Sequence, residues 1–112
     1  MKRIVYILQF MLLASSSYAG SLTPDFKVER LLQWVDGKVK IFTDQPSVNG
    51  MEGCTAVDNS IALPAGSVGT DRILAMALAA KASNATMHAW VEGCCVTHSG
   101  KQSPCISTLT IK

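Results

Sequence analysis

The sequence predicts a small, disulfide-linked domain that is mainly β with one α-helix, and three observations predict it. An Asp36-Gly37 pair lies between two runs of alternating apolar residues, the segment 70–84 is rich in Ala and Leu, and four cysteines occupy a short chain. Alternation of period two is typical of a half-buried strand, and an Asp-Gly pair favours a tight hairpin turn. Ala, Leu and Met are good helix formers.

The first 19 residues have the order of a secretory signal peptide. Lys2 and Arg3 precede a mostly apolar run at 4–14, and the segment 17–19 supplies small residues where a signal peptidase cleaves. The apolar run is shorter than the about 20 residues of a transmembrane helix. We therefore expect a signal peptide at 1–19, a single β-rich domain at 20–112, no membrane span, and a secreted or periplasmic location.

The mature chain is expected to carry no net charge. Removal of the signal leaves 112 − 19 = 93 residues and takes away Lys2 and Arg3, so that ten basic residues become eight, against eight acidic ones. Nucleic-acid binding needs a concentrated positive patch, and no run of Lys or Arg follows residue 20. We expect no nucleic-acid partner. A domain of this size has a thin core, which exported proteins commonly reinforce with disulfides.

The first two strands are predicted to form a hairpin. Apolar residues alternate at positions 26, 28, 32 and 34 and again at 39 and 41, with Arg30 interrupting the first series. A two-residue turn at Asp36-Gly37 places Trp34 opposite Val39 and puts these apolar residues on one face. The pattern therefore predicts Trp34 as a core residue.

The remaining elements follow in the order strand, helix, strand, strand. Residues 44–55 contain Pro and Gly and are predicted as loop, and a third strand ends at Pro64. The helix at 70–84 has Thr70 or Asp71 as its N-cap and Asn84 as its stop. Two further strands, at 86–92 and 106–111, complete a β-β-β-α-β-β order.

The cysteines are predicted to form two disulfides. Adjacent residues of a strand point to opposite faces, so Cys94 and Cys95 should reach different partners. Four cysteines allow three pairings, and a bond between Cys94 and Cys95 would need a strained ring. One of them therefore joins Cys54 and the other Cys105. We expect Cys95–Cys105 and Cys54–Cys94, because Cys95 and Cys105 sit near the open loop of the last hairpin.

Neither a metal site nor an active site is predicted. The chain has no CxxC pair, and its two histidines, His88 and His98, lie at no usual ligand offset from the cysteines. No nucleophile elbow or paired carboxylates of telling spacing are present. We expect no cofactor and a protein that is not an enzyme.

A candidate binding surface lies on the strand at 86–92. Residues 87, 89 and 91 are apolar and share one face, so His88 and Trp90 share the other with Thr86 and Glu92. If the apolar set faces the core, Trp90 points outward, where an indole can stack on a sugar ring or anchor a protein partner. The alternative is that this strand is inverted or covered, with Trp90 in the core.

The element order resembles that of the oligonucleotide/oligosaccharide-binding (OB) barrel. Together with the Asp36-Gly37 hairpin, the helix DRILAMALAAKAS and the strand TMHAWVEGC, it makes the chain similar to the B subunits of pentameric bacterial toxins, in the subtilase-cytotoxin and pertussis-like group. The resemblance implies a small five-stranded OB-like barrel and a glycan-binding homopentamer whose helices line a pore.

The functional hypothesis is therefore an exported, non-enzymatic binding module with a glycan or protein partner, in a homo-oligomer. Trp90 and His88 are its candidate ligand-binding residues. The alternative is a small structural or interaction protein of the envelope that has no small-molecule ligand.

Overall fold

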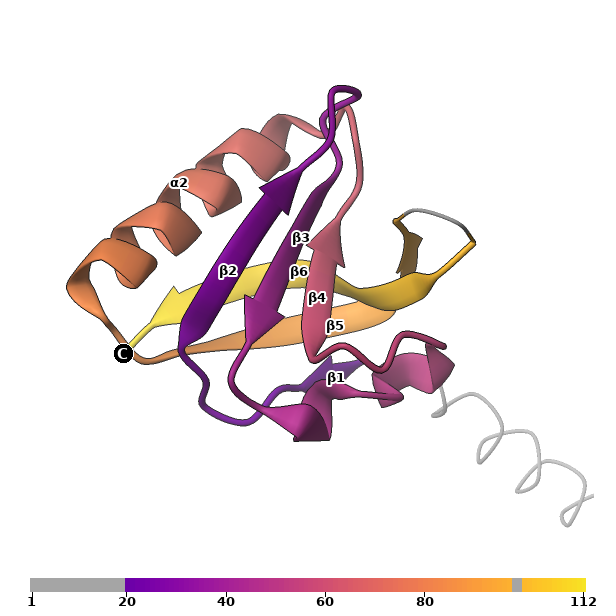
Figure 1. The fold of residues 1–112 in the computed structure, drawn as a ribbon, viewed down its shortest axis with the longest axis horizontal. Helices are drawn as coiled ribbons and strands as arrows, with labels where there is room; N and C mark the ends of the chain where they lie inside the picture. Colours follow the sequence, from indigo (N-terminus) through magenta and orange to yellow (C-terminus); the bar gives the residue numbers. More distant parts are fainter. Residues whose placement is uncertain (1–19, 98–99) are drawn as a thin grey trace, which may run out of the picture.

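The computed structural model describes residues 20–97 and 100–112 (Figure 1). The expected signal peptide at 1–19 and His98 lie outside the described residues. Within them are strands β1 to β6, one α-helix and two short 3₁₀ turns. The strands are β1 (Ser21–Leu22), β2 (Val28–Gln33), β3 (Val39–Thr43), β4 (Ser60–Leu63), β5 (Met87–Val96) and β6 (Gln102–Ile111). The helix is α2 (Val68–Ser83), and the turns are η2 (Pro46–Val48) and η3 (Met51–Gly53).

The mainly β prediction with one helix is confirmed, but the described residues form six strands rather than five. They make one mixed sheet in the order β1-β5-β6-β4-β3-β2, which is not closed, and only β4 and β6 pair in parallel. The additional strand is β1, which precedes the predicted first strand and was not expected. Pro24, which has no amide hydrogen to donate to a ladder, lies between β1 and β2. β1 pairs with β5 and β2 with β3, and a single bridge, Phe26 to Met87, lies between the two.

The first hairpin forms where it is predicted, but its register is wrong by one residue. Leu31 lies opposite Ile41, and the Trp34 amide donates to the Lys38 carbonyl across a three-residue loop. Gly37 has φ +99° and ends that loop, the geometry of a type I turn followed by a left-handed residue.

A register shift between Val28 and Arg30 restores the match between strand and core. Because a bulge moves the following side chains to the other face, Leu31 packs against the core while Leu32 is 40% exposed. Trp34, predicted as core, is partly exposed. The interruption at Arg30 was the sequence signal of this bulge.

Helix α2 begins at Val68, two residues before the predicted start. Ser67 is the N-cap residue, and the Thr70 hydroxyl instead donates to the Pro64 carbonyl at 2.9 Å. Asn84 ends the helix in the left-handed conformation, and its amide donates to Ala80 and Lys81 carbonyls, which is a common C-cap. The helix lies across β2, β3 and β6 (Figure 1).

The core fills the space between α2 and the sheet. The inner face of α2 carries Ala77 and Ala80, which are fully buried. Their small side chains let the helix approach the strands closely. The rest of the core is aliphatic and aromatic and consists chiefly of Phe26, Val39, Ile41, Ile61, Met87, Ala89 and Val91. Among residues 20–97 and 100–112, no helix has the length and hydrophobicity needed to cross a bilayer.

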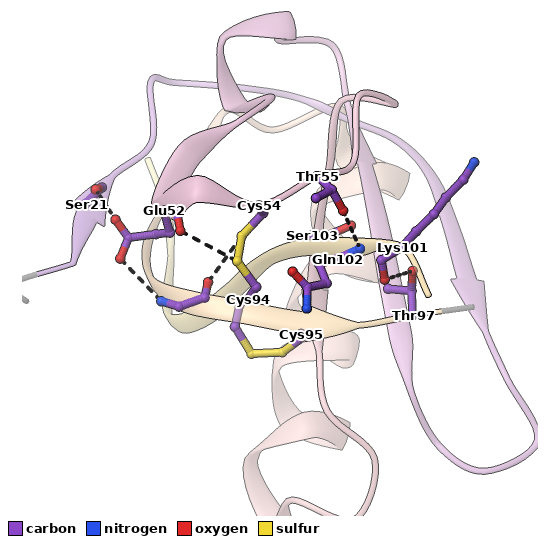
Figure 2. Close-up of a disulfide and its surroundings, with 12 residues drawn as sticks. Ser21, Glu52, Cys54, Thr55, Cys94, Cys95, Thr97, Lys101, Gln102 and Ser103 are labelled. Carbon is purple, nitrogen blue, oxygen red and sulfur yellow. Dashed lines mark hydrogen bonds between the residues drawn. A yellow bond between two sulfur atoms is a disulfide. The ribbon is translucent and has the colours of Figure 1, made fainter. Parts of the chain in front are cut away.

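Strands β5 and β6 are longer than predicted. Near the loop that joins them, they carry three of the four cysteines. Both predicted disulfides are present: Cys54–Cys94 joins the η3 loop to β5, and Cys95–Cys105 joins β5 to β6. Their Cα atoms are 5.7 and 5.0 Å apart. The side chains of Cys94 and Cys95 leave β5 in opposite directions (Figure 2), as the pleat of a strand requires.

The two disulfides should contribute unequally to stability. Their cysteines are 40 and 10 residues apart, and in the chain-entropy model the cost of losing a cross-link grows with the loop it closes. We expect the double variant Cys54→Ala/Cys94→Ala to lose about 4 kcal/mol of unfolding free energy and Cys95→Ala/Cys105→Ala about 3 kcal/mol. Urea denaturation of both variants tests this, and a larger loss for the second pair would contradict it.

Candidate functional site

The outer face of β5 carries the two residues that the sequence singles out. Met87, Ala89 and Val91 are fully buried, so of the two orientations that the sequence left open the strand has the one that turns Trp90 away from the core. His88 and Trp90 therefore lie on the face turned away from the core, and both are partly exposed. The indole is not a core residue.

Trp90 is held in place by neighbours on three strands. Its Nε1 donates a 2.9 Å hydrogen bond to Glu92 Oε1, two residues further along the same face. Leu22 on β1 and Thr108 on β6 are its register partners. Gly20 packs against the same group: a Cβ there would come within 2.7 Å of Trp90 Nε1, and its φ of +76° also favours glycine.

His88 belongs to a short chain of charged side chains next to Trp90. Its Nδ1 lies 3.9 Å from Asp25 Oδ1, and Asp25 Oδ2 accepts a 2.8 Å hydrogen bond from Lys112 Nζ. Thr110 lies opposite His88 on β6. The face thus combines an indole with carboxylate, imidazole and hydroxyl groups, which can stack on a ring and hydrogen-bond to its substituents.

The η3 loop fixes the end of this face through Glu52. Its carboxylate accepts a 2.6 Å hydrogen bond from the Ser21 hydroxyl and a 3.2 Å bond from the Gly93 amide (Figure 2). Glu52 has φ +57°, which is uncommon for a residue other than Gly, Asn or Asp. Because Cys54 of the next turn is bonded to Cys94, the loop is held to β5 by both a covalent bond and a carboxylate.

The outer face of β2 and β3, which is turned away from the core as Trp90 is, holds a second group that the sequence did not predict. Arg30 stacks on the Phe42 ring at 4.1 Å, and Lys38 Nζ lies 6.0 Å from the Trp34 ring. The ammonium group of Lys38 already has two partners. Its Nζ donates a 3.0 Å hydrogen bond to the Thr97 carbonyl and forms an ion pair with Asp36. In the sequence, residues 38, 40 and 42 alternate with the apolar residues Val39 and Ile41, which indicated that they share one face of the strand.

Lys40, which lies between Lys38 and Phe42 in the sequence, is fully buried. It forms an ion pair with Asp58, and Asp58 accepts a hydrogen bond from the Ser60 hydroxyl, which also hydrogen-bonds to Ser103 at 2.8 Å. Within the described residues, Lys40 Nζ makes no hydrogen bond of good geometry, so the ion pair is its compensation. Burial raises the pKa of Asp58, but the close contact and positive charge of Lys40 and the hydrogen bond from Ser60 outweigh it, and its pKa lies below the ordinary value.

The described residues contain neither a pocket nor a cluster of three or more metal-binding side chains. No family model, curated protein or solved structure matches the chain.

The Lys40–Asp58 pair should control the acid stability of the fold. Asp58→Asn leaves a buried ammonium without its partner, so we expect a loss of about 2–4 kcal/mol in unfolding free energy at neutral pH, less than for a fully buried pair because Asp58 is 30% exposed. The lowered pKa means that this contribution is present above the unfolded value of about 4 and is lost as the pH falls through the folded value.

Urea denaturation between neutral and acidic pH measures both effects. Glu29→Gln, an amide replacement of an exposed carboxylate on β2, is the matched control and should change stability little. Equal stability of Asp58→Asn and the control at neutral pH would show that the pair does not stabilise the fold.

Proposed function

We propose that the protein is an exported, non-enzymatic binding module that takes a glycan on the outer face of β5. The observation that carries the proposal is a partly exposed indole held by Glu92 on a face otherwise made of hydroxyl, imidazole and carboxylate groups. Aromatic rings bind sugars by stacking on their apolar C–H faces, while polar neighbours receive the hydroxyl groups. An open strand face can accommodate a saccharide, whereas a small cofactor normally binds in a concave pocket.

The strand order supports the comparison with OB-like B subunits. Strands β2 to β6 run in the order β5-β6-β4-β3-β2, with β4 and β6 parallel, and β1 leads from β2 back to β5. We infer a partly open five-stranded barrel in which β1 and β2 act as one interrupted first strand. OB barrels bind oligosaccharides and oligonucleotides on their strand faces and adjoining loops.

We further propose that the protein acts outside the cytoplasm, in the periplasm or after secretion. Two disulfides in a small domain persist in an oxidising compartment, and they are rare where thiols are kept reduced. The signal-peptide pattern at 1–19 supports the same location.

The outer face of α2 supports a homo-oligomer. Val68 is 83% and Leu78 is 52% exposed, and Ala75, Ala79 and Ala82 lie beside them on the uncovered side of the helix. Between Arg72 and Lys81, which are charged and exposed, every exposed residue of the helix is apolar, and an apolar outer surface of this kind is normally buried. A second copy of α2 is the occupant we propose, because small residues at three- and four-residue spacing let two helices approach closely.

Solution mass measurement by light scattering tests the oligomer. We expect a mass several times that of one mature chain, with five copies favoured by the toxin-subunit comparison. Leu78→Glu places a charge in the proposed helix contact and should release monomers. Val57→Glu changes another exposed apolar residue away from α2 and should leave the mass unchanged. A monomeric unmodified protein would contradict the proposal.

A glycan array followed by fluorescence titration tests the ligand. We expect binding to at least one saccharide class and a loss of about 5- to 30-fold in affinity for Trp90→Ala, since stacking on an exposed aromatic ring contributes about 1–2 kcal/mol. Trp34→Phe, in the β2–β3 hairpin, is the control and should bind as the unmodified protein does. If no saccharide binds, the alternative function, an interaction protein of the envelope, is favoured. Its partner would then bind to the outer face of α2.

A further inference from the structure

The charges around Trp90 are unbalanced, although the mature chain as a whole is neutral. Glu92 is exposed and uses Oε1 to accept the hydrogen bond from the indole, so within the described residues its Oε2 has no hydrogen-bond or ion-pair partner. The nearest described ion pairs are those that Asp25 forms with His88 and with Lys112. Glu92 therefore presents an uncompensated negative charge at the edge of the exposed indole.

The cations of the sheet lie on other strands and are already engaged. Arg30 stacks on Phe42, Lys38 donates to a carbonyl and pairs with Asp36, and Lys40 is buried with Asp58. These residues belong to β2, to β3 and to the loop that joins them, whereas Trp90 and Glu92 belong to β5, which is separated from β3 in the sheet by β6 and β4. A ligand on Trp90 meets Glu92 first.

We infer that the Trp90 face selects saccharides that carry a protonated amine and disfavours saccharides that carry carboxylate or sulfate groups. This inference rests on the proposed function and names its ligand class. An ammonium over an indole gains a cation–π attraction, and the same ammonium can pair with Glu92 Oε2. An anionic sugar in that position would face the carboxylate, whereas Arg30, Lys38 and Lys40 lie on or beside other strands and are engaged there. Neutral sugars would stack without either effect.

The size of the preference follows from two exposed interactions. A cation–π contact and a solvent-exposed ion pair together correspond to about a 5–10-fold tighter binding of the amine-bearing saccharide than of its neutral counterpart. The preference should weaken at high salt, because exposed charges are screened.

The test compares three saccharides of equal length in mildly acidic buffer: tetraglucosamine, tetra-N-acetylglucosamine and tetragalacturonate. Binding is followed by fluorescence of the Trp34→Phe variant, which retains Trp90 as its one tryptophan, and by calorimetry on the unmodified chain. We expect tetraglucosamine to bind about 5–10-fold more tightly than the acetylated tetramer, and tetragalacturonate to bind most weakly. Equal or tighter binding of tetragalacturonate would overturn the inference.

Glu92→Gln separates charge from structure. Its amide oxygen can still accept the hydrogen bond from Trp90 Nε1, so the acetylated tetramer should bind within about twofold of the unmodified protein while the preference for the amine disappears. Glu29→Gln removes one negative charge from β2 and should leave the preference intact, which excludes a general effect of net charge. A preference that survives Glu92→Gln would also overturn the inference.

The failure of the inference differs from the failure of the proposed function. Binding of the acetylated tetramer that depends on Trp90, without a preference for the amine, rejects the inference alone. If no tetramer binds, or if Trp90→Ala binds all three as before, the proposed glycan site on β5 is rejected with it.

Discussion

The pleat of β5 is the constraint on which the rest of the structure depends. Three buried side chains, Met87, Ala89 and Val91, anchor one face of this strand in the core, and alternation then turns Trp90 to the other face. A register shift between Val91 and Cys94 interrupts the alternation. Beyond it the two adjacent cysteines leave the strand in opposite directions, Cys94 toward the η3 loop and Cys95 toward β6. The exposed face and the cross-links are therefore both built on β5.

A small domain has little core with which to hold such an arrangement, and covalent and ionic contacts supplement it. The η3 loop is attached to β5 through Cys54 and through the carboxylate of Glu52. Away from β5, the buried pair of Lys40 and Asp58 joins β3 to the residues before β4, and the Ser60–Ser103 hydrogen bond extends this polar group to β6.

Features with a local cause could be predicted from the sequence. The hairpin, the helix with its Asn84 stop and both disulfides follow from turn chemistry, helix propensity and strand alternation, and the structure contains all of them. The Trp90 surface was predicted as one of two orientations, because alternation gives the two faces of a strand without saying which is buried.

Features that depend on distant segments could not be predicted. The bulge at Val28–Arg30 and the three-residue turn shift the hairpin register, and both depend on how Leu31 meets a core assembled from other elements. Lys40 alternates with apolar neighbours as a solvent-facing residue would, yet Asp58 and the residues of β6 bury it. The partnership of Glu52 with Ser21 and Gly93 likewise joins segments far apart in the chain.

Mass spectrometry of the non-reduced protein tests the orientation of β5 most directly. Trypsin leaves Cys54 in peptide 41–72, the adjacent cysteines in 82–101 and Cys105 in 102–112, all held in one cluster. Backbone cleavage between Cys94 and Cys95 should then release residues 82–94 bonded to 41–72 and residues 95–101 bonded to 102–112. Residues 82–94 bonded to 102–112, or free thiols in the native protein, would contradict the account.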